Sequence, residues 1–333
     1  MDTSAHHLAY WTKERLDATC LPFYRQYERE LQEHYTVYFA RHSHLRSPHH
    51  RYSALSLAAA LPPGHADLQR LIPRKAQHRF ICSARSSQAL ALALLGVAAK
   101  VDPSLHWFWD SLQLPFQVDT TRPSSCSFEF PLDQHDLNEK PRVSQLDFLV
   151  RHRAACASVE VKWEEALGSC SCLRQCEGSP LPGAHCAARV YDRAAYWTVA
   201  REVFGLPAKR SPCLPCPISP IYQIVRNVAA VRHLAGDRRP AVFVLLYDAR
   251  NPFYCRTGDW PGWPAMLSSV LNASESTQFC FRALSWQQLI ARLPLPSSVK
   301  AWAREKHCLG SHSKRDVVAE ISSARIGCRT QPA

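Results

Sequence analysis

Three side chains in a short stretch of the sequence have the types and spacing needed for metal-assisted chemistry. Asp147 lies in one expected strand, and Glu160 lies in the next, two residues before Lys162. Because strand side chains alternate between faces, Glu160 and Lys162 point to the same face. Pairing of the two strands would bring Asp147 beside Glu160, where two carboxylates repel unless a cation lies between them. Oxygen ligands of this kind favour Mg²⁺ or Mn²⁺.

A lysine beside such a metal has two chemical uses. It can orient or deprotonate an attacking water, and it can stabilise the negative charge that develops on phosphorus. These are the parts that phosphodiester hydrolysis needs. The alternative is that Glu160 and Lys162 form an ordinary solvated strand face. Glu160-Val161-Lys162 is the only Glu-x-Lys in the chain and it ends a short apolar strand, which favours a site.

The elements that must position these residues can be read from periodicity. The first forty residues repeat apolar side chains at spacings near three and four, which is typical of a helix. Ser86, Ser87 and Gln88 begin a run of Ala and Leu that predicts a buried helix. We expect an aromatic connector over 103–115. We expect strands over 127–130, 145–150, 155–161 and 241–247 and helices over 221–234 and 285–293. This order indicates an α/β fold with a mixed central sheet flanked by helices.

Composition limits the classes of partner and compartment. The chain has 333 residues, of which 46% are hydrophobic, so a packed core is expected. A formal net charge of +12, mostly from arginine, suits a polyanion such as nucleic acid or an acidic membrane surface. The longest apolar run, 89–99, is far short of a bilayer span, and no signal peptide is visible. We therefore expect a cytoplasmic protein, no membrane partner, and reduced or metal-bound cysteines.

The segments 141–147 and 159–162 resemble the PD-(D/E)xK nuclease superfamily and, within it, a group of bacterial restriction-endonuclease-like proteins. Flanking pieces at 86–89, 222–226 and 242–248 fit the same layout, so the likeness covers roughly residues 80–250. The resemblance implies an αβββαβ core, Mg²⁺ dependence and phosphodiester cleavage. It also implies that Asp147 and Glu160 bind the metal and that Lys162 is the catalytic lysine.

Four further residues enter through the same resemblance. Gln88 stands where related nucleases often have an acidic residue in the first core helix, and Glu129 is a candidate substitute as a metal ligand. Gln223 matches a glutamine that lies near the active site in some exonuclease-like relatives. Arg226, one helical turn along, could contact phosphate. Gln223 and Arg226 could equally be ordinary surface residues.

A cysteine-rich segment over 168–217 has the composition of an insertion and carries six of the 14 cysteines. Cys213 and Cys216 form a CxxC knuckle, and two further thiolates would complete a tetrahedral Zn²⁺ site or hold a 4Fe-4S cluster. The preferred ligands are Cys176, Cys186, Cys213 and Cys216, with Cys170 and Cys172 as alternates. The alternative is that these thiols are small buried hydrophobes.

Together these patterns predict three parts: a helical extension over 1–79, a nuclease core over 80–255 that includes the insertion, and a C-terminal extension over 256–333. The expected function is Mg²⁺-dependent hydrolysis of DNA, in restriction or defence. Two alternatives remain open: a catalytically inactive nucleic-acid-binding protein of the same fold, and a zinc-stabilised protein-interaction module. A homodimer is also expected, because cutting both strands at one place usually takes two active sites.

Overall fold

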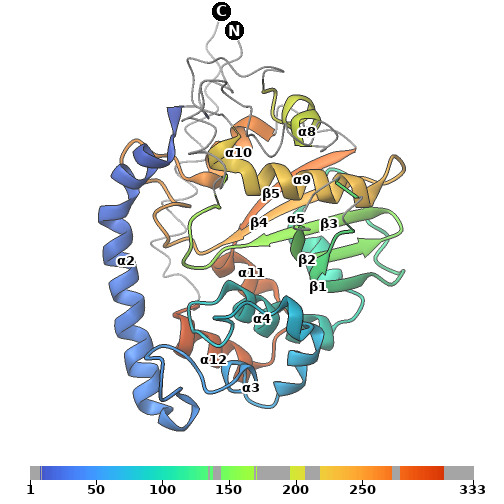
Figure 1. The fold of residues 1–333 in the computed structure, drawn as a ribbon. Coiled ribbons are helices and arrows are strands. Elements are labelled where there is room, and N and C mark those ends of the chain that lie inside the picture. Colours follow the sequence, from blue (N-terminus) through green and yellow to red (C-terminus); the bar gives the residue numbers. More distant parts are fainter. Residues whose placement is uncertain are drawn as a thin grey trace, which may run out of the picture.

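A five-stranded mixed sheet forms the centre of the molecule (Figure 1). The computed structural model describes residues 8, 10–133, 136–137, 144–168, 170, 196–206, 218–271 and 278–310. The strands follow one another in the sheet in chain order. Antiparallel pairs join the first three, and parallel pairs add the last two. The strands are β1 (Ser125–Pro131), β2 (Gln145–His152), β3 (Ala155–Val161), β4 (Ala241–Tyr247) and β5 (Phe279–Ser285).

Helices cover both faces of this sheet (Figure 1). One face carries α8 (Tyr196–Glu202), α9 (Tyr222–Ala235) and α10 (Trp263–Leu271). The other face carries α4 (Ser87–Val101), α5 (His106–Leu112) and α11 (Trp286–Arg292), with α12 (Ser297–His307) and α3 (Leu57–Ala60) beyond them. The long helix α2 (Lys13–Arg41) runs past the side of both layers and contributes buried residues to both cores. Short 3₁₀ turns complete the set: η1 (Ser43–Leu45), η2 (Ala66–Leu71), η3 (Arg74–Ala76) and η4 (Ser219–Ile221). The mixed sheet flanked by helices confirms the expected fold class.

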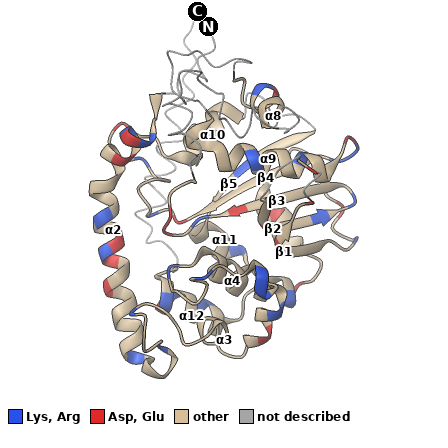
Figure 2. Ribbon diagram, viewed as in Figure 1, with Lys and Arg blue, Asp and Glu red and all other residues tan. Residues whose placement is uncertain are grey.

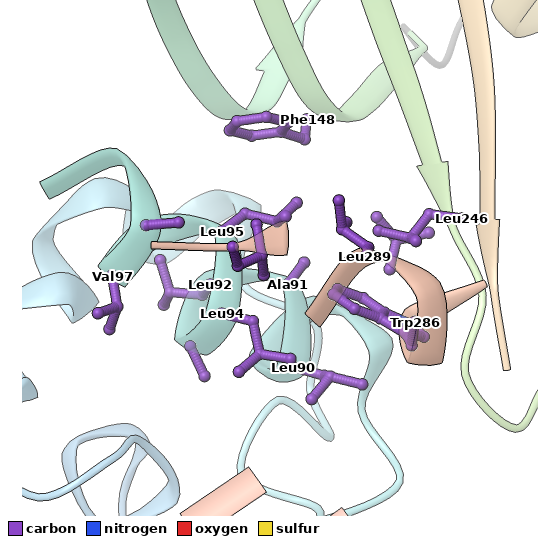
Figure 3. Packing of buried hydrophobic residues seen from close by; sticks show 14 of the residues in the cluster. Leu90, Ala91, Leu92, Leu94, Leu95, Val97, Phe148, Leu246, Trp286 and Leu289 are labelled. Carbon is purple, nitrogen blue, oxygen red and sulfur yellow. The ribbon is translucent and has the colours of Figure 1, made fainter. Parts of the chain in front are cut away.

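The local sequence of helix α4 explains where the helix begins and why it is buried. The Ser86 hydroxyl accepts a hydrogen bond from the Ala89 amide at 3.1 Å and caps the helix. All ten residues from 89 to 98 are buried, because the helix is apolar on every side and lies under the sheet. Figure 3 shows its leucines packed below Phe148 of β2 and beside Trp286 and Leu289 of α11.

The expected hairpin between β2 and β3 is confirmed. Phe148 pairs with Val159 and His152 with Ala155, which leaves a two-residue turn between the strands. Every residue of β3 and of β4 is buried, as expected for strands in the middle of a covered sheet.

Two elements differ from the sequence expectations. Residues 106–112, within the expected aromatic connector, form the helix α5, and Leu105 before it has a left-handed backbone. The Phe108 ring then packs on Phe148 of the sheet, 6.1 Å between centroids. Strand β5 was not expected, and it joins the sheet from beyond residue 255, the end that we expected for the core.

No single described helix is both long enough and apolar enough to cross a membrane. Helices α4 and α5 meet the length and composition criteria only as a pair, bent by 116°, and α4 lies mostly in the interior.

Candidate active site

Three carboxylates lie in one row across three neighbouring strands. The β2–β3 register pairs Phe148 with Val159, and its next step sets Asp147 opposite Glu160. The β1–β2 register pairs Phe128 with Phe148 and Phe130 with Leu146, so Glu129 falls opposite Asp147. Residues that oppose one another in an antiparallel pair lie close together. The fold therefore brings together Glu129, Asp147 and Glu160, which the sequence spreads over 32 positions.

Glu160 is almost completely buried, and three donors hold its carboxylate. Gln223 Nε2 donates to Oε1 at 2.5 Å, and Lys162 Nζ lies 2.8 Å from the same oxygen. Asn227 Nδ2 donates to Oε2. Gln223 and Asn227 are four residues apart on α9, so one face of that helix supplies both amides. A buried carboxylate with this set of donors has a fixed orientation.

Lys162 follows the last residue of β3, and its backbone amide donates to Leu246 of β4 at 2.7 Å. Its side chain is only 7% exposed, which excludes the alternative of a solvated strand face. Burial acts to lower the pKa of Lys162, but Glu160, Glu165 and Asp147 outweigh it and hold that pKa above its usual value. The ammonium is therefore charged at neutral pH and faces the carboxylates.

Asp147 lies in the middle of the row and is only partly exposed. Its Oδ2 accepts a hydrogen bond from the Val161 amide at 2.8 Å. Burial, followed by the negative charges of Glu160 and Glu129, raises the pKa of Asp147 well above its usual value, although Lys162 opposes this. The carboxylate row therefore carries electrostatic strain that a cation would relieve.

Glu129 combines burial with an unusual backbone. Its φ of +49° places it in the left-handed region, which costs a non-glycine residue about 1–2 kcal/mol. Burial and the charge of Glu160 raise the pKa of Glu129 to about 7, while a hydrogen bond with Gln88 acts to lower it. Strained, buried carboxyls with pKa values near neutrality are concentrated at functional sites.

The carboxylate oxygens of this row suit a hard divalent cation that keeps part of its water shell. No three described His, Cys, Asp or Glu side chains converge into a preformed metal cage. Mg²⁺ is commonly bound by one or two carboxylates together with water and substrate phosphate, so a cage is not needed. The raised pKa values of Asp147 and Glu129 point the same way, because a bound cation would stabilise both as carboxylates.

The remaining residues named from the resemblance also lie near the row. Gln223 bridges from Glu160 to the Gly168 amide, which donates to its Oε1 at 2.9 Å. Arg226 is one helical turn away on α9, and its Nε is buried without a hydrogen-bond partner among the described residues. Gln88, at the start of α4, contacts Glu129.

Sequence reasoning missed residues that support the site. Asn227 holds Glu160, and the only local signal is its four-residue spacing from Gln223. The turn after Lys162 is held by Glu164, which is buried and accepts from Tyr35 at 2.6 Å and from Arg85 at 2.5 Å. These partners come from α2 and from the segment before α4, so no spacing in the sequence could reveal them.

The proposed cysteine site falls almost entirely outside the described residues. This applies to Cys172, Cys176, Cys186, Cys213 and Cys216. Cys170 is described, and its backbone amide donates to the Ser219 carbonyl at 3.0 Å. The metal at this cluster stays a prediction.

A mixed sheet flanked by helices, with a buried carboxylate–lysine group on its central strands, defines a restriction-endonuclease-like α/β protein. A family model described as restriction endonuclease associating with ARP matches residues 9–306. The chain belongs to this family, which indicates a nuclease role with nucleic acid as the substrate. Comparison with curated proteins gave no match, and neither did comparison with solved structures.

Proposed function

We propose that the chain is a Mg²⁺-dependent nuclease of the PD-(D/E)xK type that hydrolyses phosphodiester bonds of DNA. One observation carries the proposal: a buried, charged lysine lies 2.8 Å from Glu160, beside Asp147 and Glu129, whose pKa values are raised. A structural ion pair needs one carboxylate for one lysine. The additional carboxylates are costly for stability and are explained by a metal that the substrate phosphate helps to bind.

In this proposal Asp147 and Glu160 hold the metal. Glu129 becomes a third oxygen ligand only if the bound metal draws its side chain in, since no three described carboxylates converge on one point. The metal would act as a Lewis acid on the phosphate and lower the pKa of the attacking water. Lys162 stabilises the negative charge that develops on the phosphoryl oxygens. Its raised pKa favours this role over that of a base, because it keeps its proton at neutral pH. Gln223 belongs to the site because it orients Glu160.

Positive charge supports the choice of substrate. The chain carries 40 Lys and Arg residues against 28 Asp and Glu, and Figure 2 shows the cations spread over helices and loops around the sheet. Arg226 lies one helical turn from Gln223 on α9 and is a candidate phosphate contact. Binding to DNA should therefore weaken steeply as salt rises.

The test is cleavage of supercoiled plasmid and of linear single-stranded DNA with Mg²⁺ or Mn²⁺. Asp147→Ala and Lys162→Ala should each lose at least about a hundredfold in rate while staying folded. Lys13→Ala and Glu33→Ala, two exposed positions on α2, are matched controls and should keep full activity. Binding without cleavage in every protein would favour the inactive nucleic-acid-binding alternative, and equal cleavage in all of them would refute the site.

Two finer proposals accompany this one. We propose that two copies act together on DNA, in restriction or defence, and sedimentation with and without DNA would show whether a dimer forms. We propose a structural Zn²⁺ at the cysteine cluster, with a 4Fe-4S cluster as the alternative. Metal analysis separates the two, since iron–sulfur protein absorbs visible light and zinc protein does not. Metal content without any affinity for DNA would favour the protein-interaction alternative.

A further inference from the structure

The segment 73–80, between the 3₁₀ turn η2 and helix α4, is a basic and aromatic surface next to the carboxylate row. We infer that it is a binding platform for single-stranded nucleic acid, which feeds an unpaired strand to the site. This inference rests on the proposed function, since it names the form of the substrate.

All the charged side chains of this segment are positive. Arg74, Lys75 and Arg79 are all exposed, and no acidic residue occurs between Ile72 and Ile81. Figure 2 shows Lys and Arg on the segments that flank α4. None of these three cations has an ion-pair partner among the described residues. Unpaired exposed cations at this density suit a chain of phosphates.

An exposed aromatic side chain accompanies the cations. Phe80 is 51% exposed, although burial of a phenylalanine is normally favourable. The guanidinium carbon of Arg79 lies 4.4 Å from the centre of its ring, and the His78 ring lies 5.5 Å away. Three planar groups thus gather at one end of the segment. Nucleobases stack on aromatic rings and on guanidinium planes.

A rigid frame displays these side chains. Ile72 and Ile81 are buried and fix both ends of the segment. Gln77 Nε2 donates to the Ile72 carbonyl at 3.1 Å, and the Ile81 amide donates to the His78 carbonyl at 2.9 Å. A surface that is already ordered loses little conformational entropy when it binds.

Gln88 joins this surface to the site. Its Oε1 accepts from the His78 amide at 2.9 Å, and its Nε2 donates to the Ala76 carbonyl at 3.0 Å. The same side chain also lies close enough to Glu129 of the carboxylate row to act on its pKa, which it lowers. One amide group therefore separates the backbone of the segment from a proposed metal ligand. A glutamate at this position could not donate to Ala76, which explains why an amide rather than an acid stands here.

The aromatic group decides between a duplex and a single strand. Bases in a duplex are stacked on each other, and their faces are closed to a surface side chain. An unpaired strand offers both phosphates and base faces at once. A surface that carries three exposed cations together with an exposed Phe80, with Arg79 over its ring, matches that combination, whereas cations alone would serve a duplex equally well.

The test measures binding separately from cleavage, in the Asp147→Ala protein, by fluorescence anisotropy. The probes are a labelled oligothymidylate, an oligouridylate and a DNA duplex of equal length. Phe80→Leu keeps an apolar side chain but loses the ring and should bind the single strand roughly tenfold more weakly, while Phe80→Trp should keep its affinity. Phe23→Leu on α2 is the matched control, since Phe23 is 54% exposed, and it should bind as the parent protein does.

The charges are tested in the same assay. Changing Arg74, Lys75 and Arg79 together to alanine should lower the salt dependence of single-strand binding by about two counterions. Arg25→Ala with Arg29→Ala on α2 is the control pair. The inference is overturned if Phe80→Leu binds the single strand as the parent does, or if the segment variants weaken duplex binding alone. Tighter binding of RNA than of DNA would uphold the platform and contradict the DNA substrate of the proposed function.

These outcomes separate the two proposals. A protein that cleaves plasmid through Asp147 and Lys162, yet binds single strands equally well with and without the Phe80 ring, keeps its function and loses the platform. A protein that shows no cleavage but weakens on Phe80→Leu keeps the platform and loses the nuclease.

Discussion

Glu129→Gln should stabilise the metal-free protein at neutral pH, although it removes a buried charged group. The pKa of Glu129 rises from 4.5 to about 7 on folding, mainly because the carboxyl is buried. Between these values the folded protein binds more protons than the unfolded chain, so stability falls as pH rises through this window. Full ionisation then costs about 3 kcal/mol, and glutamine avoids that cost.

Urea unfolding monitored by tryptophan fluorescence, in EDTA and from pH 4.5 to 8, measures this effect. The two proteins should be nearly equal at pH 4.5, and the variant should become more stable by up to about 3 kcal/mol at pH 8. Glu33→Gln, which removes an exposed carboxylate of α2, is the control for net charge. Parallel stability curves for wild type and Glu129→Gln would refute the electrostatic argument for the carboxylate row.

Mg²⁺ provides a second check of the same reasoning. If Asp147 and Glu129 share a cation, Mg²⁺ should stabilise wild type at pH 8 more than it stabilises Glu129→Gln, because the metal binds carboxylates rather than carboxylic acids. Equal stabilisation of the two proteins would remove Glu129 from the ligand set.

Three other perturbations follow from the structure. Asn227→Leu leaves one oxygen of buried Glu160 without its hydrogen-bond donor. The kcat should therefore fall about tenfold or more with little change in KM. An unchanged kcat would show that Asn227 does not position the carboxylate. Burial lowers the pKa of Lys306 from 10.5 to about 7, so the folded protein binds fewer protons across this window and its stability should rise with pH. Lys306→Met should abolish that rise in urea unfolding between pH 7 and 10, and a persisting rise would assign it to another group. Gly262→Ala would place a Cβ 2.7 Å from a backbone oxygen at a φ of +89° and should lower the free energy of unfolding by about 2 kcal/mol or more. Gly64→Ala, with a φ of +81° and open space around the position, should lower it by less. Equal losses of stability in thermal unfolding would contradict the steric reasoning.

Local pattern was sufficient for β1 to β4 and for part of the site, but not for β5. Alternation along β3 placed Glu160 and Lys162 on one face, and the expected pairing of the two strands brings Asp147 alongside. The same pattern predicted the apolar strand β4 and the capped helix α4, because strand and helix periods are properties of neighbouring residues.

The sequence by itself therefore determined which residue types could do chemistry and on which strands they lie. Only the tertiary structure decided that Glu160 and Lys162 are buried, that Asn227 holds the carboxylate, and that Gln88 connects the site to a basic surface. It also set the left-handed backbone of Glu129. The physical reason is that burial, pKa and hydrogen-bond partners depend on groups from distant segments, which no local spacing specifies.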